Sequence, residues 1–314
     1  MSDIKPLIWS FGVGSRGCGN GQDDYFIEDG QIKFGPTDPR YKDAVEYIRD
    51  LVAEGLIDPN WSSISGDERK SNMLTGVSGV TYGSFSGILS TYNALFEADG
   101  KEKPLVSFAP LTGPTGYSGL QGMHTSIDIG YGGAVSSTCS NSEAVAKLFN
   151  FTYSEEGRKL LYYGIEGDTY TTLSDGSLAY TDKVTKNELG TLAWLKEYVA
   201  NVSCYPSALL PSHYFATLSE EGLEGNKLST EIASKEGNLK VPAIRFSAEE
   251  ADTSASILTD INSYVDENFT AFVNGTKSMS EWDSFLAGFD SLRLDELNTI
   301  YEMAYKRFLE NTKQ

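Results

Sequence analysis

The strongest hydrophobic periodicity in this chain lies in residues 41–54, where apolar side chains recur at intervals of three and four. This spacing places them on one face and predicts an amphipathic helix. Gly55 follows the last turn, where a positive φ is favoured, and the sequence DPN at 58–60 predicts that the helix stops. Residues 77–82 are apolar or β-branched and bounded by glycines, which predicts a strand. The strand is expected to end in the aromatic tip YGSF at 82–85.

The residues before this helix predict a loop and a hairpin. The apolar run LIW at 7–9 leads into the glycine-rich sequence GVGSRGCG. That sequence lacks the Gly-Lys-Ser/Thr ending and the following helix of a phosphate-binding loop, so a plain loop is the better interpretation. Residues 25–34 place two apolar runs around an Asp-Gly pair, which predicts a hairpin.

The middle of the chain mixes strand and helix signals. A short helix is expected near residues 91–100, and the apolar run PLVSFAP at 104–110 predicts a strand. Ser140 and Glu143 have the spacing of a capping box and predict the start of a helix. A further helical piece is expected from Ser154.

The last half of the chain is dominated by predicted helices. An Asp-Gly pair within 164–182 predicts a second hairpin, and residues 187–217 are expected to be mostly helical. Residues 218–246 are polar and are expected to be irregular. A capping box at Ser247 then opens a long helix through Val273, and two shorter helices are expected from Ser280 and Asp295. The pattern therefore indicates an α/β or α+β protein whose helices gather toward the C-terminus.

Composition narrows the class of protein. The 314 residues suit one large or two ordinary domains, and 40% hydrophobic residues are enough for a core. The net charge of -19 comes from 44 acidic and 25 basic residues and includes no basic stripe, which argues against a nucleic-acid partner. A carboxylate surplus of this kind is typical of a solvated surface.

The cysteine and histidine residues give no metal site. Cys18, Cys139 and Cys204 lie far apart, and together with His124 and His213 they show no metal-ligand spacing. One disulfide is compatible with this count, but none is required. No cofactor motif, signal peptide or transmembrane run is recognisable, and the first residues read as a chain entered partway.

Paired carboxylates raise the alternative of a glycoside hydrolase, which needs an acid and a base or nucleophile about 5–10 Å apart. The pairs Glu155/Glu156 and Glu249/Glu250 lie at predicted helix starts, where carboxylates stabilise the helix dipole. Asp23/Asp24 is a third pair. No Ser/His/Asp set or Gly-x-Ser-x-Gly motif supports another enzyme class. The hydrolase remains the alternative to a non-catalytic binding protein.

Six phrases distributed along the chain carry a resemblance to a known family. They are DGQIKFGPTDPRYKDAVEYIRDLVAEGLIDPNW at 29–61, NSEAVAKLFNFTYSEEGRKLLYYGIEGDTYT at 141–171, DGSLAYTD at 175–182, FSAEEADTSASILTDINSYVDENFTAFVNG at 246–275, MSEWDSFLAGF at 279–289 and LDELNTIYEMAYKRF at 294–308. In this order they resemble family 1 of the extracellular solute-binding proteins of ABC importers, in the lipoprotein form of Gram-positive bacteria. The resemblance implies a bilobal, type II periplasmic-binding-protein-like α/β fold that closes on its ligand.

The chain departs from the family at its front, where the lipid-attached cysteine and the first part of the N-terminal lobe have no counterpart. The resemblance therefore implies an incomplete N-terminal lobe. It assigns residues 1–103 to the C-terminal lobe, residues 104–165 to a return into the N-terminal lobe, and residues 166–314 to the C-terminal lobe again.

The resemblance also implies where a ligand binds. A sugar presents apolar ring faces, on which aromatic side chains stack, and hydroxyl edges, to which polar groups hydrogen-bond. The loop after the first strand and the tip of the later strand line the cleft in the family, and the lobe-crossing segment can face it. The corresponding ligand-binding candidates are Trp9, Phe11, Arg16, Tyr82, Ser84, Phe85, Asp128 and Tyr131. Core packing is the competing interpretation for Trp9, and a structural role competes for Asp128 and Tyr131.

The function implied is the carbohydrate-binding component of an ABC importer, which delivers an oligosaccharide to membrane permease subunits. The resemblance implies a monomer on the extracellular face of the cell membrane, held by a lipid anchor that this chain lacks. No cofactor, metal or catalytic residue is expected. A sensor that uses the same fold without transport remains open.

Overall fold

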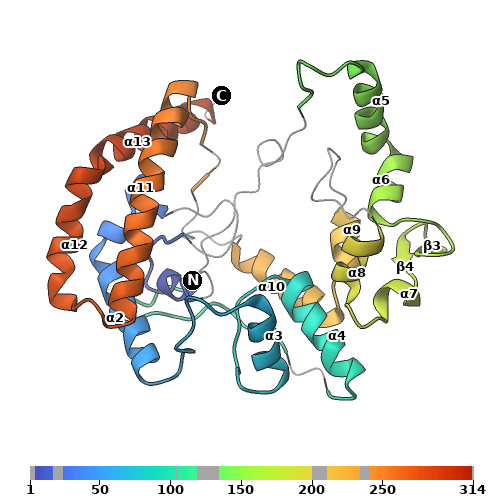
Figure 1. Ribbon diagram of the computed structural model, residues 1–314, viewed down its shortest axis with the longest axis horizontal. Coiled ribbons are helices and arrows are strands. Elements are labelled where there is room, and N and C mark those ends of the chain that lie inside the picture. Colours follow the sequence, from blue (N-terminus) through green and yellow to red (C-terminus); the bar gives the residue numbers. More distant parts are fainter. Residues whose placement is uncertain are drawn as a thin grey trace. The chain divides into compact units, whose positions relative to one another are not determined.

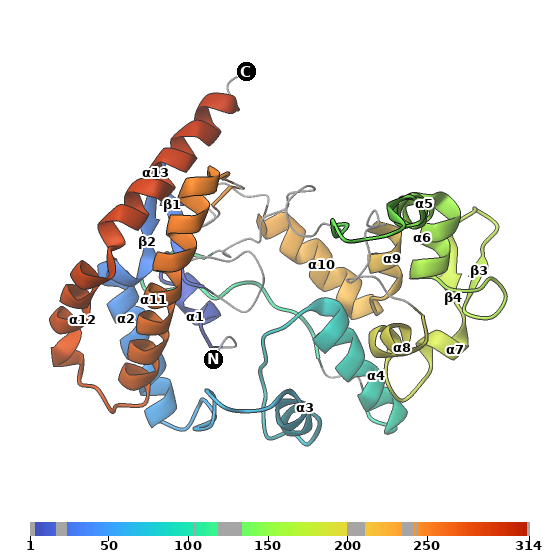
Figure 2. The ribbon, with the colours of Figure 1, turned by 45° about the horizontal axis from the view of Figure 1, so that its top comes forward.

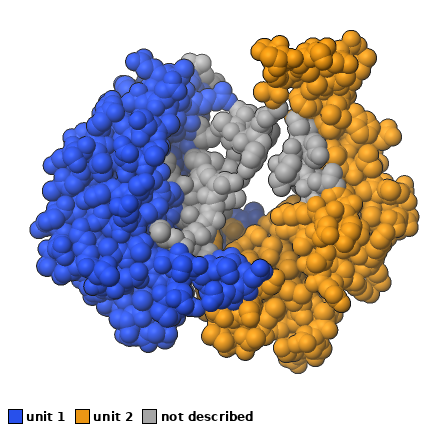
Figure 3. Space-filling model, viewed as in Figure 1, with its two compact units in different colours: residues 1–69, 109–125, 230–314 blue, residues 70–108, 126–229 orange. Residues whose placement is uncertain are grey.

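The computed structural model describes residues 4–16, 24–102, 105–118, 134–199, 211–233, 241–242 and 244–312 (Figure 1). The chain divides into two compact units, which Figure 3 draws in different colours. Unit 1 comprises residues 1–69, 109–125 and 230–314, and unit 2 comprises residues 70–108 and 126–229. Each unit therefore combines segments that are distant in sequence.

Unit 1 is built mainly from helices packed around a short hairpin. Its C-terminal helix α11 packs against α2 and α13, and α13 packs against β2 (Figure 2). In chain order its elements are α1 Pro6–Trp9, β1 Tyr25–Glu28, β2 Gln31–Phe34, η1 Gly35–Thr37, α2 Pro39–Ala53, α11 Ala248–Val273, η3 Met279–Glu281, α12 Trp282–Gly288, η4 Phe289–Leu292 and α13 Leu294–Asn311. Helix α3, Gly66–Leu74, lies across the boundary between the units.

Unit 2 consists of shorter elements. These are η2 Phe85–Ser90, which is a π-helix, α4 Thr91–Ala98, α5 Ser142–Tyr153, α6 Glu155–Tyr162, β3 Tyr170–Thr172, β4 Leu178–Tyr180, α7 Asp182–Thr185, α8 Thr191–Tyr198, α9 Pro211–Ala216 and most of α10 Glu220–Ala233. Helix α5 packs against α6, and α4 continues from η2.

The predicted helix at 41–54 is confirmed as α2, and its ends follow simple capping rules. The Asp38 carboxylate accepts a hydrogen bond from the Arg40 backbone N–H, and Pro39 occupies the first turn. Four residues of one face, Tyr41, Ala44, Val45 and Ile48, are buried. Gly55 adopts a φ of +73°, as the helix end requires.

Both predicted hairpins are confirmed. Strands β1 and β2 pair in antiparallel register with Ile27 opposite Ile32, and Asp29 and Gly30 both have positive φ in the turn. Strands β3 and β4 pair with Tyr170 opposite Tyr180. Among the described residues, these two hairpins contain all the named strands.

Some predicted elements are wrong. Residues 77–82 and the described part of 104–110 belong to no strand, because β-propensity needs a neighbouring strand with which to pair. The run LIW at 7–9 lies in the short helix α1. Residues 218–246, expected to be irregular, include helix α10.

Two predicted helix caps are displaced by a residue or two. Asn141, and not Ser140, caps α5 by accepting a hydrogen bond from the Ala144 backbone N–H. Ser278, and not Ser280, forms the capping box before α12. In both places several serine or asparagine side chains are close together, and the backbone geometry selects one of them.

The core of unit 1 is rich in aromatic side chains. Phe285 of α12 is 1% exposed, and its ring contacts the rings of Trp282, Tyr264 and Phe272 at centroid distances of 4.9, 5.5 and 5.8 Å. Such tilted and offset pairs add to the free energy that burial alone supplies. The helices predicted from residue 247 onward are thereby confirmed as the framework of this unit.

Candidate functional site

The two predicted aromatics at the front of the chain are buried in unit 1. The Trp9 side chain is 1% exposed, and its indole Nε1–H donates to the Ser15 carbonyl oxygen at 3.0 Å. Phe11 is 6% exposed and packs against the Tyr47 ring at a centroid distance of 5.8 Å. This burial favours packing over an open stacking platform, and the ligand role of both residues stays a prediction.

Arg16 is held at the end of the same segment. Its backbone N–H donates to the buried Asp24 carboxylate at 2.7 Å, which joins the two ends of the glycine-rich stretch. The guanidinium forms an ion pair with Asp266 of α11 at 2.6 Å, and Lys5 forms a second ion pair with the same carboxylate at 2.6 Å. About a quarter of the Arg16 side chain, 24%, remains exposed. Arg16 is therefore positioned on α11 and still accessible to solvent.

Gly12 fits this segment tightly against two other parts of unit 1. It has a φ of +74°, and a Cβ at this position would lie 3.4 Å from Tyr117 and 3.5 Å from the Arg40 guanidinium. A side chain here would therefore be strained by both the backbone and its neighbours. The glycine-rich composition indicated a loop, but it did not reveal this contact.

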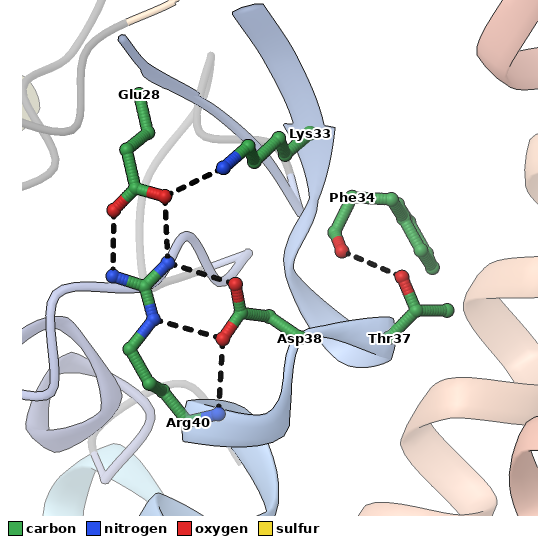
Figure 4. A network of polar contacts seen from close by, with 6 residues as sticks. All are labelled: Glu28, Lys33, Phe34, Thr37, Asp38 and Arg40. Carbon is green, nitrogen blue, oxygen red and sulfur yellow. Dashed lines mark hydrogen bonds and ion pairs between the residues drawn. The ribbon is translucent and has the colours of Figure 1, made fainter.

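Arg40 is the centre of a network of charged residues beside this segment, which Figure 4 shows. Its guanidinium binds both Glu28 oxygens, at 2.7 and 3.1 Å, and both Asp38 oxygens, each at 2.8 Å. The hydrogen bond from Arg40, followed by that from Lys33, lowers the pKa of Glu28. Burial raises the pKa of Asp38, but its hydrogen bonds from Arg40 outweigh burial, so the net pKa is lowered. The network fixes the β1–β2 hairpin to the start of α2.

The aromatic tip of unit 2 starts a helix and does not end a strand. The Ser84 hydroxyl accepts a hydrogen bond from the Gly87 backbone N–H at 3.0 Å and caps η2. Ser84 is exposed, whereas Tyr82 and Phe85 are partly exposed. A Cβ on Gly225 of α10 would lie 2.7 Å from the Phe85 ring, so this glycine lets α10 approach Phe85.

The structure does not place all the candidates together. Trp9, Phe11 and Arg16 belong to unit 1, and the tip at 82–85 belongs to unit 2. Asp128 and Tyr131 lie outside the described residues. All eight ligand assignments stay predictions.

A cavity of about 510 Å³ lies in unit 2, beside α6 and the loop that follows it. It is lined by Glu155, Glu156, Lys159, Leu160, Gly164, Ile165, Glu166 and Tyr170. Lys159 forms an ion pair with Glu155 at 2.8 Å, and Glu166 accepts a hydrogen bond from the Thr172 hydroxyl at 2.6 Å. The sequence phrase GIEGDTY drew attention to this loop, but the expected backbone hydrogen bonds of Glu166 are replaced by a side-chain contact.

The glutamate pairs considered for hydrolysis serve other roles in the structure. Glu155 lies in the first turn of α6, and the hydrogen bond from Lys159 lowers its pKa. Glu250 completes the capping box of α11, and the hydrogen bond from Arg307 lowers its pKa. A general acid at neutral pH needs a raised carboxyl pKa, so both shifts have the wrong sign for that role.

A buried histidine lies among tyrosines under the same loop. His213 of α9 is 6% exposed, and its Nδ1 is hydrogen-bonded to the Tyr180 hydroxyl at 2.7 Å. Burial lowers the pKa of His213 to about 4 and raises that of Tyr180. The Tyr162 and Tyr163 rings flank the imidazole at centroid distances of 4.6 and 5.8 Å. A lone histidine gave no sequence signal for this cluster.

Two further features bear on the class of protein. Within the described residues, no three histidine, cysteine or acidic side chains lie close enough to hold a metal ion. Nor does any helix of the described part of the chain have the length and hydropathy needed to cross a membrane.

Comparison with known sequences places this arrangement in context. Residues 6–159 match the family model described as bacterial extracellular solute-binding protein. The fructooligosaccharide ABC transporter substrate-binding protein FusA of Streptococcus pneumoniae is 22% identical over 344 aligned positions. That alignment covers 98% of this chain and 56% of FusA.

Solved structures show the same fold. The alginate-binding protein AlgQ2, solved without calcium ion, matches with a TM-score of 0.77 and 18% identity, over 98% of this chain and 63% of that one. S. pneumoniae FusA in complex with kestose matches with a TM-score of 0.71 and 19% identity, over 98% and 61%. An HMO-binding solute-binding protein from Bifidobacterium longum infantis gives 0.67 and 18%, over 97% and 62%. The predicted bilobal type II fold is thereby confirmed, and the chain spans about three fifths of these relatives.

Proposed function

We propose that this chain, which belongs to the bacterial extracellular solute-binding proteins, is the carbohydrate-binding part of an ABC importer. The observation that carries the proposal is the extent of the match to carbohydrate-binding relatives. Three proteins whose names specify alginate, kestose or HMO as ligand share its fold over 97–98% of the chain. An oligosaccharide is therefore the ligand class that the relatives support.

The residues available for such a ligand differ between the two units. Unit 2 offers the exposed hydroxyl of Ser84 and the partly exposed rings of Tyr82 and Phe85, a combination suited to hydroxyl edges and ring faces. Unit 1 offers the partly exposed guanidinium of Arg16. We further propose that the buried Trp9 acts through the position of Arg16, since its indole anchors the Ser15 carbonyl one residue away.

Phe11, Asp128 and Tyr131 remain part of the proposed ligand site. The proposed mechanism is differential closure, in which sugar binds one lobe and gains contacts from the other in the closed state. The lobe assignment of 1–103, 104–165 and 166–314 is part of this proposal. So are the permease partner, the extracellular location, the monomeric state and a lipid anchor outside these residues.

The alternative of a glycoside hydrolase has less support. Glu155 and Glu250, from two of the three carboxylate pairs, have lowered pKa values and partners that explain them. The relatives are named as binding proteins and not as hydrolases. Release of reducing sugar from any oligosaccharide by the purified protein would reverse this preference.

The test is calorimetric titration with kestose, nystose and alginate oligosaccharides, after a thermal-shift screen of the same sugars. For the sugar that binds, Phe85→Ala should weaken binding by about 1–3 kcal/mol, as expected for a lost stacking contact. Phe215→Ala on α9, where Phe215 is 45% exposed, is the matched control and should leave the affinity unchanged. Equal affinity of both variants and the parent would remove Phe85 from the site. Failure of all the sugars to bind the natural gene product would count against the function itself.

A further inference from the structure

Helix α5 exposes a large apolar surface together with the segment that follows it. Leu148 and Tyr153 of α5 are 54% and 51% exposed, and Leu160 and Ile165 farther along are 47% and 63% exposed. Of the twelve residues of α5, Thr152 is the one that is buried. The helix therefore contributes almost nothing to the core of unit 2.

The apolar side chains of α5 form one face. At 100° per residue, Val145, Leu148, Phe149 and Thr152 share a side of the helix, and Glu143 and Lys147 lie on the opposite side. Glu143 and Lys147 form an ion pair at 2.7 Å. An amphipathic helix whose charged side is solvated normally buries its other side, and soluble monomers rarely expose a contiguous apolar surface of this kind.

A second group of exposed apolar residues in unit 2 has the same explanation. Residues 77–82 and 105–108 have the sequence of strands, yet the structure pairs them with no strand. Val77, Val80 and Val106 are 73%, 71% and 70% exposed. Strand-like segments with exposed valines lack the neighbour that would cover them.

We propose that the α5–α6 face is an interface for a further α/β polypeptide module, equivalent to the part of the relatives that has no counterpart in these 314 residues. The α5–α6 face is defined here by Leu148, Phe151, Leu160 and Ile165. The alignments cover 97–98% of this chain but only 56–63% of each relative, so the shared fold includes a substantial body of polypeptide beyond the match. An apolar-faced module of that size suits an uncovered helix face and two unpaired strand segments. The proposal does not depend on which ligand the protein binds.

Cysteine labelling tests whether the face is covered. Leu148→Cys is introduced into the natural gene product purified from its own cells, and into the 314-residue chain. Maleimide labelling is followed peptide by peptide by mass spectrometry, so that Cys18, Cys139 and Cys204 do not interfere. Protection by an interface should slow labelling of the introduced thiol at least about 10-fold in the natural product relative to the 314-residue chain. Leu309→Cys on α13, where Leu309 is 37% exposed, is the control and should label at the same rate in both.

The sign of a stability change gives a second readout. Leu148→Ser combined with Phe151→Ser should lower the folded-to-unfolded ratio of the natural product by at least about 30-fold, because it removes buried apolar atoms. In the 314-residue chain the same change should leave that ratio within about 3-fold and reduce binding of a hydrophobic dye.

Three results would overturn the proposal. Rapid labelling of the Leu148→Cys variant of the natural product at the introduced thiol would show that nothing covers the face. Protection in a monomeric 314-residue chain would show that another part of the same chain covers it. Protection that appears only as the 314-residue chain dimerises would identify a second copy as the occupant.

Discussion

Helices α11 and α5 differ in burial although both are well capped. Helix α11 of unit 1 begins with a capping box formed by Ser247 and Glu250, and eight of its 26 residues are buried. Helix α5 of unit 2 begins with a side-chain cap from Asn141, but one of its twelve residues is buried. The comparison shows that local sequence is sufficient to form a helix, whereas its contribution to stability depends on what packs against it.

The largest expected effect contrasts two phenylalanines. Phe285→Ala removes a ring that is 1% exposed and surrounded by aromatic side chains, and it should cost about 3–5 kcal/mol of unfolding free energy. Phe151→Ala on α5 removes a ring that is 38% exposed and should cost less than about 1 kcal/mol in the 314-residue chain. Denaturant melts of both variants measure the difference. Similar losses would mean that α5 is as well packed as α12.

A pH series examines the buried histidine of unit 2. Burial lowers the pKa of His213 from 6.5 to about 4, so between these values the unfolded chain binds a proton that the folded chain does not. Stability should therefore be full above about pH 6.5 and should fall by up to about 3 kcal/mol as pH decreases toward 4.

The control for this pH series is His213→Gln, which cannot titrate. Glu28 and Asp38 of unit 1 also have lowered pKa values, so they too lose stability in acid, but they do so equally in both proteins. The difference between the two stability curves isolates His213. Parallel curves between pH 6.5 and 4 would contradict the assigned shift.

A pair of glycine substitutions sharpens the description of the tip in unit 2. A Cβ on Gly225 would lie 2.5 Å from the Ser107 hydroxyl and 2.7 Å from the Phe85 ring. Gly225→Ala should therefore cost about 1–3 kcal/mol despite the higher helix propensity of alanine. Gly66 starts α3 with open space around it, so Gly66→Ala should be neutral or slightly stabilising. Equal stability of the two variants would show that α10 does not pack on Phe85.

The smallest expected effect compares the two helix caps directly. Ser247→Ala should cost about 1 kcal/mol, because α11 is coupled to the core of unit 1. Asn141→Ala should cost less than about 0.5 kcal/mol in global unfolding, because α5 can fray without opening the rest of unit 2. Thermal melts measure the global effect, and amide exchange at α5 should still detect the local one. A larger loss at Asn141 would reverse the comparison.

Much of unit 1 was predictable from the sequence, and less of unit 2 was. The helix at 41–54, the two Asp-Gly hairpins and the long helix from 247 to 273 have strong local signals, and all are confirmed. The predicted strands at 77–82 and 104–110 are wrong, because apolar and β-branched residues mark a segment that can pair but do not supply its partner. Helix α10 was missed because its glycines, Gly222 and Gly225, read as breakers, whereas the structure uses Gly225 for close packing.

The candidate site shows the same limit. Arg16 and Trp9 were selected by position in a family pattern, and no local rule indicates that Asp266, 250 residues farther along, binds the guanidinium. Nor could the sequence show that Trp9 is 1% exposed, since an apolar run of three residues fits a buried helix or a strand equally well.

The sequence by itself determined where the helices of unit 1 and the hairpins begin and end, because caps, glycines and periodicity act over a few residues. It also determined the family through ordered phrases that span most of the chain. The tertiary structure decided which faces are buried, which charges pair across long separations, and that the apolar face of α5 lies open. Those properties depend on contacts between distant segments, and a pattern of neighbouring residues carries no information about them.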